Sequence, residues 1–313
     1  MEEDRTPDLR IANAALSQLS YHPEKRADST RSAGMRQIAG SRGYNQSKHR
    51  AEIILDINPP YGYQEIVPLA KTHKVLLPAE RKLPVLFRNL TALPLSFAEF
   101  APAVHDYPIA FISGDAGSTF VAMAILGLEA QQNLFVVGDD SWDAGVYLPA
   151  YVRRYPFCMT RVTVDGKEQS ERIACVEKRA VNAKGEALYD SRGEPLPVWD
   201  HLRKLLFEFE ADLARTEELC RKLQELRLLE TFTAQVAPQN EPPIALTGMY
   251  RVSEEKLQAL PAGTLQELAR YGMLSRVYAQ LLSLDNFQRL LDRRAQLRAP
   301  EKPARKVDPK KLN

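Results

Sequence analysis

The sequence predicts an α+β fold with a mainly antiparallel sheet, a long amphipathic helix and a helical C-terminal part. Short β-rich runs separated by Pro, Gly and Asp occupy residues 65–195. Apolar residues then recur every three or four positions over 197–229, which is the period of a helix. Two more strand-like runs and several helical runs follow. We expect the C-terminal strand pair to return to the main sheet and complete one folded unit.

Composition divides the chain into three parts. Residues 1–64 are polar, rich in Arg and Ser, and lack a sustained apolar period, so they cannot bury enough surface to offset the entropy of ordering. We expect them to form a disordered leader, in which Met35 is an alternative start. Residues 65–298 are expected to form a single domain. The polar, basic tail at 299–313 is expected to be disordered.

Short elements open the predicted domain. Residues 66–69 and 75–77 are candidate strands. The run LPLSFAEFAPAVHDYP predicts a short helix, because Ser96 suits the N-cap, Glu99 falls at N3 and Pro108 ends the pattern.

A hairpin is the clearest part of the predicted sheet. The apolar runs YPIAFIS and TFVAMAILGL flank GDAGS, which supplies the glycines and aspartate of a turn. The next run, QNLFVVGDDSWDAG, predicts a third strand, so that the three make a meander. Residues 157–164 and 172–177 are expected to extend the same sheet.

Strands and helices complete the domain after the long helix. Residues 232–236 and 244–252 predict two strands. Thr264 and Glu267 predict a capping box for one of the helices that follow. Gly272 is expected just past the end of that helix, where a left-handed residue is needed.

The three cysteines predict no cross-link and no metal site. Cys158, Cys175 and Cys220 are widely spaced, with neither a C-x-x-C pair nor a His at metal-ligand spacing. Cys220 also falls on the apolar stripe of the long helix. We therefore expect small buried side chains in a reducing compartment.

Charge is distributed unevenly along the chain. The formal net charge is +2, but residues 1–50 carry +3 and residues 293–313 carry +6, which leaves about −7 for the body between them. An acidic body does not favour nucleic acid as a partner. No run approaches the ~18 apolar residues of a membrane span, and the first residues lack the pattern of a signal peptide. These features predict a cytoplasmic protein without a transmembrane segment.

The sequence lacks the common motifs of nucleotide-binding, hydrolase and metalloprotease sites. It has no phosphate-binding glycine loop, no G-x-S-x-G elbow and no H-E-x-x-H pair, so no cofactor is predicted. The acidic turn GDDSWDAG holds Asp139, Asp140 and Asp143, but their spacing is not that of a calcium loop. We favour a solvated turn whose aspartates cap backbone amides over a cation site, and predict no metal.

The segment YLPAYVRRYPF follows the acidic turn and concentrates aromatic and basic side chains. Pro149 is expected to begin a short helix that places Tyr151 and Tyr155 on one face. Arg153 and Arg154 diverge from that face, and their guanidinium groups are expected to reach the aspartates of the acidic turn.

Two interpretations of this aromatic and basic cluster remain open. The favoured one is structural, with arginine stems covering aromatic rings and Trp142 folding back over the sheet. The alternative is recognition of an anionic group beside the aromatic rings. The candidate binding residues are then Trp142, Asp143, Tyr151, Arg153, Arg154 and Tyr155.

Several ordered pieces resemble the bacterial SapC family, which is named for a protein associated with paracrystalline surface layers. The most specific are LPLSFAEFAPAVHDYPIAF and WDAGVYLPAYVRRYPF, and LYDSRGEP and YAQLLSLDNFQRLLDR add to them. The resemblance runs from about Glu65 to Arg294. It implies a connection with the bacterial cell surface or surface layer, and it brings no catalytic residue and no cofactor.

The leading hypothesis is a non-catalytic binding or accessory protein linked to surface-layer or cell-envelope processes, with a protein or peptide partner. An exposed Arg, Tyr and Trp cluster, of a kind enriched at interfaces, would be its contact surface. A self-assembling lattice subunit is a further possibility. The rival hypothesis is an enzyme acting on a peptide or small metabolite near Trp142. Its candidate acid–base residues are Glu99, His105, Asp139, Asp140 and Asp143.

Overall fold

The structure, a computed structural model, describes residues 55–56, 59–113, 117, 119–138, 140–164, 167–238 and 241–298. Most of the expected leader lies outside these residues. The expected tail lies wholly outside them.

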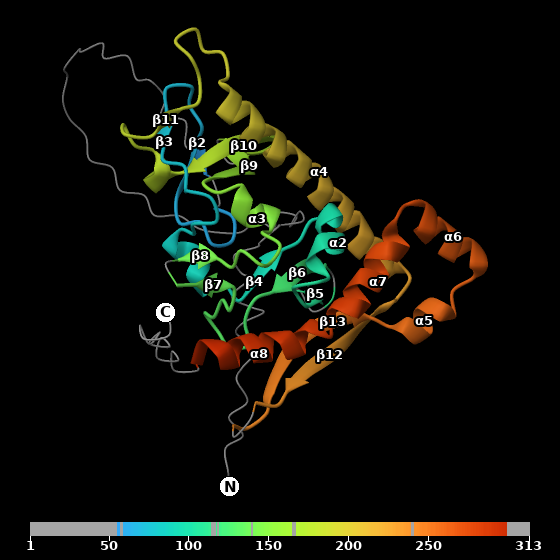
Figure 1. The fold of residues 1–313 in the computed structure, drawn as a ribbon. Coiled ribbons are helices and arrows are strands. Elements are labelled where there is room, and N and C mark those ends of the chain that lie inside the picture. The colour runs from blue at the N-terminus through green and yellow to red at the C-terminus, as the bar shows by residue number, and fades with distance from the viewer. Residues whose placement is uncertain are drawn as a thin grey trace, which may run out of the picture.

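The α+β fold is confirmed, and its larger sheet is antiparallel (Figure 1). The strand order is β12 (Leu229–Val236), β13 (Ile244–Val252), β5 (Ile109–Ile112), β6 (Val121–Ile125) and β4 (Ala92–Pro94). The predicted hairpin is β5–β6. The C-terminal strand pair returns to this sheet as predicted, because Tyr250 of β13 lies opposite Phe111 of β5.

A second antiparallel sheet and two small ribbons complete the β structure. The second sheet has the order β1 (Leu55–Asp56), β9 (Phe157–Val164), β10 (Lys167–Glu177) and β2 (Ile66–Pro68). The ribbons pair β3 (Lys74–Val75) with β11 (Glu186–Ala187), and β7 (Val136–Val137) with β8 (Ser141–Trp142).

Two predictions about the sheet are wrong. The run after the hairpin forms the separate β7–β8 ribbon, and β4 takes the place beside β6. The amide of Asn133 explains the change, since it donates to Phe87 O at 2.9 Å and accepts from Phe135 N at 3.0 Å, which turns the chain before a third strand begins. The β9–β10 hairpin forms, but in its own sheet.

Helices occupy one side of the molecule and its C-terminal part (Figure 1). They are α2 (Phe100–Ala103), α3 (Ala150–Arg153), α4 (Pro197–Glu225), α5 (Glu254–Gln258), α6 (Ala262–Arg270), α7 (Met273–Ser283) and α8 (Asn286–Arg298). Short 3₁₀ helices lie at Val85–Asn89, Phe97–Glu99 and Lys178–Ala180. Within the described residues, no helix combines the length and apolar character needed to cross a bilayer.

Local signals predicted most of the helix ends that they addressed. Ser96 and Glu99 form the expected capping box. Gly272, at φ 69°, separates α6 from α7 in the left-handed conformation that favours glycine. The second capping box is wrong, because α6 starts directly after Pro261 and Thr264 already lies inside it.

The long helix α4 bridges two hydrophobic cores. Trp199 and Leu206 belong to a smaller core at the second sheet, whereas Leu219 and Leu223 belong to the larger core. Its 29 residues rise about 43 Å, which is enough to reach both. Figure 1 shows α4 running along one side of the molecule from β9 and β10 to α7. Its apolar stripe is therefore shared between the two sheets.

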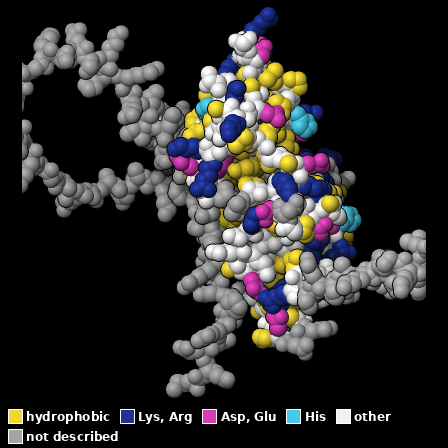
Figure 2. Space-filling model, turned by 60° about the vertical axis from the view of Figure 1, so that its left-hand side comes forward, with side chains coloured by type: hydrophobic (Ala, Val, Ile, Leu, Met, Phe, Trp, Pro, Cys, Tyr) yellow, Lys and Arg dark blue, Asp and Glu magenta, His cyan; other side chains and the backbone are white. Residues whose placement is uncertain are grey.

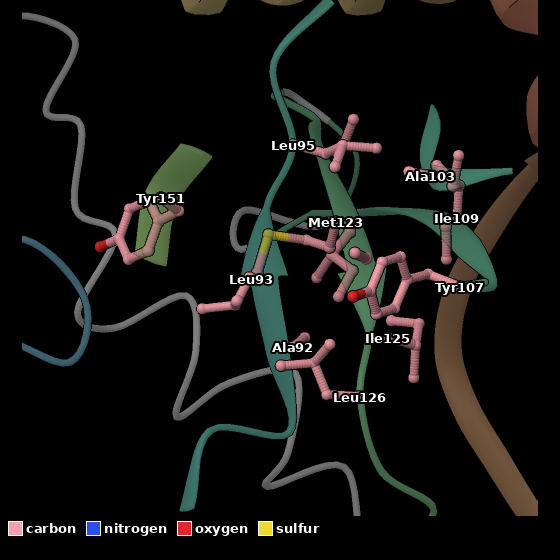
Figure 3. Close-up of a cluster of buried hydrophobic side chains, with 14 of the residues drawn as sticks. Ala92, Leu93, Leu95, Ala103, Tyr107, Ile109, Met123, Ile125, Leu126 and Tyr151 are labelled. Carbon is pink, nitrogen blue, oxygen red and sulfur yellow. The ribbon is translucent and has the colours of Figure 1, made fainter. Parts of the chain in front are cut away.

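The larger core lies around β4, β5 and β6 (Figure 3). Leu93 of β4, Ile109 of β5 and Met123 of β6 have no exposed surface. Each side chain of this size contributes about 1.5–3 kcal/mol on full burial. Tyr107 lies just before β5, and its ring points into the same cluster. Its hydroxyl accepts a hydrogen bond from Trp142.

The folded part begins earlier than the sequence predicts. Tyr61 and Tyr63 lie within the expected leader, yet both are buried. Tyr63 Oη donates to Phe157 O at 2.8 Å, and Tyr61 O accepts from Tyr151 Oη at 2.6 Å. These partners are 94 and 90 positions away, so the local polar composition gives no sign of them.

The cysteines are free and buried, as predicted. Cys158 and Cys175 lie opposite each other on β9 and β10. Burial raises the pKa of Cys175 to about 11 and that of Cys220 to about 12. The thiols therefore stay protonated at neutral pH and act as apolar side chains.

Candidate functional site

The segment YLPAYVRRYPF forms the single helical turn α3 and the approach to β9. Pro149 is the N-cap, as predicted, and the Tyr155–Pro156 peptide bond is cis. Arg153 is exposed, whereas Arg154 is only 3% exposed. The candidate binding residues thus separate into a buried group and a surface group.

Arg154 lies among aromatic rings. Its guanidinium carbon is 4.2 Å from the ring centroid of Tyr151, 4.9 Å from that of Phe209 and 5.6 Å from that of Tyr63. The negative faces of aromatic rings attract a cation at these distances. We call Arg154, its three rings and the nearby Glu210 the arginine cage. Arg154 and Tyr151 are both buried inside the cage and cannot meet a partner.

Glu210 of α4 supplies the carboxylate of the arginine cage. Its Oε1 lies 3.5 Å from Arg154 Nη1, and its Oε2 pairs with Arg172 of β10. Burial raises the pKa of Glu210 to about 7, although the Arg154 charge opposes this shift. Arg154 Nε has no hydrogen-bond partner among the described residues. The prediction that Arg154 reaches the acidic turn is wrong, because α4 brings Glu210 against it.

Trp142 is also part of the core. It is 1% exposed, its ring stacks on Phe135 at 5.9 Å between centroids, and its Nε1 donates to Tyr107 Oη at 3.0 Å. A buried indole needs such a partner for its N–H. The predicted exposed cluster of Arg, Tyr and Trp is therefore wrong for Trp142, as it is for Tyr151 and Arg154.

Asp143 stabilises its own turn and anchors α8. One carboxylate oxygen accepts from Gly145 N at 2.9 Å, as expected for an aspartate that caps backbone amides. The other accepts from Arg293 Nη1 at 2.8 Å. The Gly145 bond and then the Arg293 bond hold the pKa of Asp143 below its ordinary value. The carboxylate of Asp143 thus already has a cationic partner, Arg293 of the same chain.

The neighbouring aspartates do not join Asp143 in a shared site. Asp140, at φ 67°, pairs with Arg88, and Asp139 lies outside the described residues. Throughout the part of the chain that the structure describes, no three His, Cys, Asp or Glu side chains are grouped to hold a metal ion.

Glu99 has a structural role that the sequence only partly predicts. Besides capping its helix through Ser96, its Oε1 accepts from Tyr147 Oη at 3.0 Å and from Ala150 N at 2.6 Å. Glu99 thereby fixes the start of α3. His105 is exposed. The described acid–base candidates are therefore dispersed among separate contacts.

Arg153 and Tyr155 reach the surface at a groove between α3 and α4, with a volume of about 220 Å³. The apolar walls of this α3–α4 groove are Leu77, Pro78, Tyr155, Val198 and Leu202. Its polar side chains are Arg153 and His201. On the face shown in Figure 2, hydrophobic side chains come to the surface in the upper half of the molecule, between Lys and Arg side chains.

The basic side of the α3–α4 groove is held by local contacts. Arg153 Nε donates to Leu148 O at 3.1 Å, and its Nη2 donates to Tyr147 Oη at 3.1 Å. Burial raises the pKa of Tyr155 to about 12, and the charge of Arg179 acts in the opposite sense. Arg179 is itself exposed. Arg153 is thus the arginine that lines the groove beside Tyr155.

Sequence reasoning found two of the groove residues and missed the others. Val198, His201 and Leu202 lie on the first turns of α4, where they extend the apolar stripe to its edge. Leu77 and Pro78 come from the chain after β3. No sequence signal joins these stretches, because they are about 120 positions apart and meet only over the smaller core.

A second hollow lies between α4 and α6, with a volume of about 150 Å³. Its walls carry both signs of charge, including Arg221, Lys222, Glu218 and Glu225. Lys222 pairs with Glu267 across it at 3.0 Å. Mixed and paired charges make this hollow a helix–helix contact rather than a selective site.

The sequence of the chain matches one known protein family. The SapC family profile matches residues 70–290, which is most of the sequence. The chain belongs to the SapC family. The match includes α3, the arginine cage residues of α4 and the whole α3–α4 groove. No curated protein and no solved structure gave a match to this SapC chain.

Proposed function

We propose that this SapC-family chain is a non-catalytic binding or accessory protein in surface-layer or cell-envelope processes. Its recognition surface is the α3–α4 groove, which takes part of a protein partner. The link to the envelope follows from family membership. The contact surface follows from the position of Arg153 and Tyr155.

One observation carries the proposal: two of the candidate residues that reach the surface, Arg153 and Tyr155, line an apolar groove together. Arg153 and Tyr155 stand beside Val198 and Leu202, so a partner removes apolar surface from water next to a guanidinium group. Arginine and tyrosine are enriched among the residues that dominate binding energy.

The same geometry gives little support to the enzyme hypothesis. Catalytic acids and bases must reach one reacting group together. Glu99 instead accepts hydrogen bonds from Ser96 and Ala150, and Asp143 accepts from Gly145 and Arg293, so both carboxylates hold segments of the fold together. Neither lines the α3–α4 groove.

Affinity capture from native cell lysate tests the proposal. The bait is the full chain, compared with the double variant Arg153→Ala/His201→Ala, whose two side chains are exposed. The control variant is Arg221→Ala/Tyr278→Ala, which changes exposed residues of α4 and α7 away from the groove. Mass spectrometry should identify envelope or surface-layer proteins with the wild type and the control.

The double variant should lose most of this captured protein, because it removes both polar side chains of the groove. Equal capture by all three baits would refute the groove as the recognition surface. Capture of proteins with no relation to the envelope would instead refute the proposed process.

A further inference from the structure

The α3–α4 groove is small and apolar. Small-molecule sites commonly enclose roughly 300–1,000 Å³. At about 220 Å³, this groove is nearer the size of one large side chain than of a whole ligand. Leu77, Val198 and Leu202 give it aliphatic walls, and Tyr155 gives it an aromatic one. An inserted apolar side chain therefore gains contact on several sides.

The charge that lines the groove is positive. Arg153 is among its described lining residues, and no acidic side chain is. Glu177, whose charge helps to raise the pKa of Tyr155 after burial, is itself fully buried and accepts from the backbone N–H groups of residues 64 and 65. A guanidinium has five N–H donors, and two of those on Arg153 are used by its own chain.

The remaining donors favour a carboxylate that lies beside the inserted side chain. A phosphate backbone would match the charge but not the aliphatic walls. Residues 51–292 carry a formal charge of about −7, so the positive charge of Arg153 at the groove is a local feature that attracts an acidic segment. Charge complementarity thus sets both where and how the partner docks.

We propose that the α3–α4 groove binds a peptide segment of a partner protein in which one large apolar side chain is flanked by acidic residues. This inference rests on the proposed function and adds the chemistry of the partner. The apolar side chain enters between Leu77 and Leu202. The flanking carboxylates pair with Arg153.

Fluorescence anisotropy with the full chain tests this chemistry. The probe is a fluorescein-labelled peptide, Gly-Glu-Glu-Phe-Glu-Glu-Gly. Two matched peptides carry Lys in place of every Glu, or Ala in place of Phe. The acidic Phe peptide should bind at least about tenfold more tightly than either, because each control removes one of the two complementary features.

A charge reversal separates recognition from a structural role. Arg153→Glu should weaken binding of the acidic Phe peptide by about tenfold and strengthen binding of the Lys peptide. Loss of structure alone does not create affinity for the opposite charge. The control Arg221→Glu changes an exposed arginine elsewhere on α4 and should leave both affinities unchanged.

Three results would overturn the inference: no binding of the acidic Phe peptide at millimolar concentration, equal binding of all three peptides, or equal binding by the wild type and Arg153→Glu. The proposed function stands or falls separately. Suppose that Arg153→Ala/His201→Ala loses the captured partner but the acidic Phe peptide does not bind the wild type. The groove then recognises a partner of other chemistry.

Discussion

Arg153 and Arg154 are consecutive residues of one type in opposite environments. Arg153 is exposed at the α3–α4 groove, where two of its donors serve backbone and hydroxyl oxygens nearby. Arg154 is buried, with three rings around it and Glu210 as its counter-ion. The difference shows that a basic doublet beside aromatic residues is not one functional unit.

The physical reason lies in how each charge is compensated. A buried guanidinium must be paired and surrounded, since leaving water costs several kcal/mol for an unpaired ion. The arginine cage provides this compensation and leaves Arg154 committed to the fold. An exposed guanidinium is already solvated, so Arg153 can exchange water for a partner at little cost.

The largest expected effect on stability comes from removing the Arg154 side chain from the arginine cage. Arg154→Ala leaves Glu210 buried without its cage partner and opens a void between Tyr151 and Phe209. We expect the free energy of unfolding to fall by about 3–5 kcal/mol. Urea unfolding followed by circular dichroism measures this change. A loss of less than ~1 kcal/mol would mean that the cage does not hold the fold together.

The next effect is a change in the pH dependence of stability. The pKa of Glu210 is about 7 in the folded chain, above its ordinary 4.5, so the folded state binds this proton more tightly than the unfolded state. The contribution to stability is therefore complete below about pH 4.5 and is lost as the pH rises to about 7. Glu210→Gln should remove this part of the decline, on the order of 3 kcal/mol.

Urea unfolding at pH 4.5 and 7.5 compares the two proteins. Glu218→Gln on the exposed face of α4 is the control and should keep the wild-type dependence. If wild type and Glu210→Gln decline equally over this range, Glu210 titrates near its ordinary value and remains ionised beside its arginines.

The smallest effect on stability is expected for the exposed arginine, Arg153. Arg153→Ala removes an exposed side chain and should change the free energy of unfolding by no more than about 0.5 kcal/mol. The measurement is the same urea titration used for Arg154→Ala. A loss that matches the Arg154→Ala value would erase the distinction between the two arginines.

Prediction from sequence succeeded where the signal was local. The Ser96–Glu99 capping box, the Gly272 helix end and the β5–β6 hairpin depend on residues a few positions apart. The long helix was also predicted, since its apolar period repeats over many turns. The meander failed because Asn133 bonds to Phe87, which lies 46 positions earlier.

The candidate site was predicted only in part for the same reason. The sequence identified Arg153 and Tyr155, but not the α4 side chains that stand opposite them in the groove. It also grouped Trp142 with them, although Trp142 stacks on Phe135 inside the larger core. The local sequence shows that these residues are close along the chain. It does not show which of their side chains face water.

The sequence by itself determined the α+β class, the position of the long helix and the membership of the SapC family, because each is written in local patterns or in ordered motifs. Only the tertiary structure decided which arginine is buried and which is exposed. That decision depends on α4, which brings Glu210 and Phe209 against Arg154 from more than 50 positions away and leaves Arg153 at the edge of its packing. Solvation acts on the folded surface, and that surface exists only once distant segments have met.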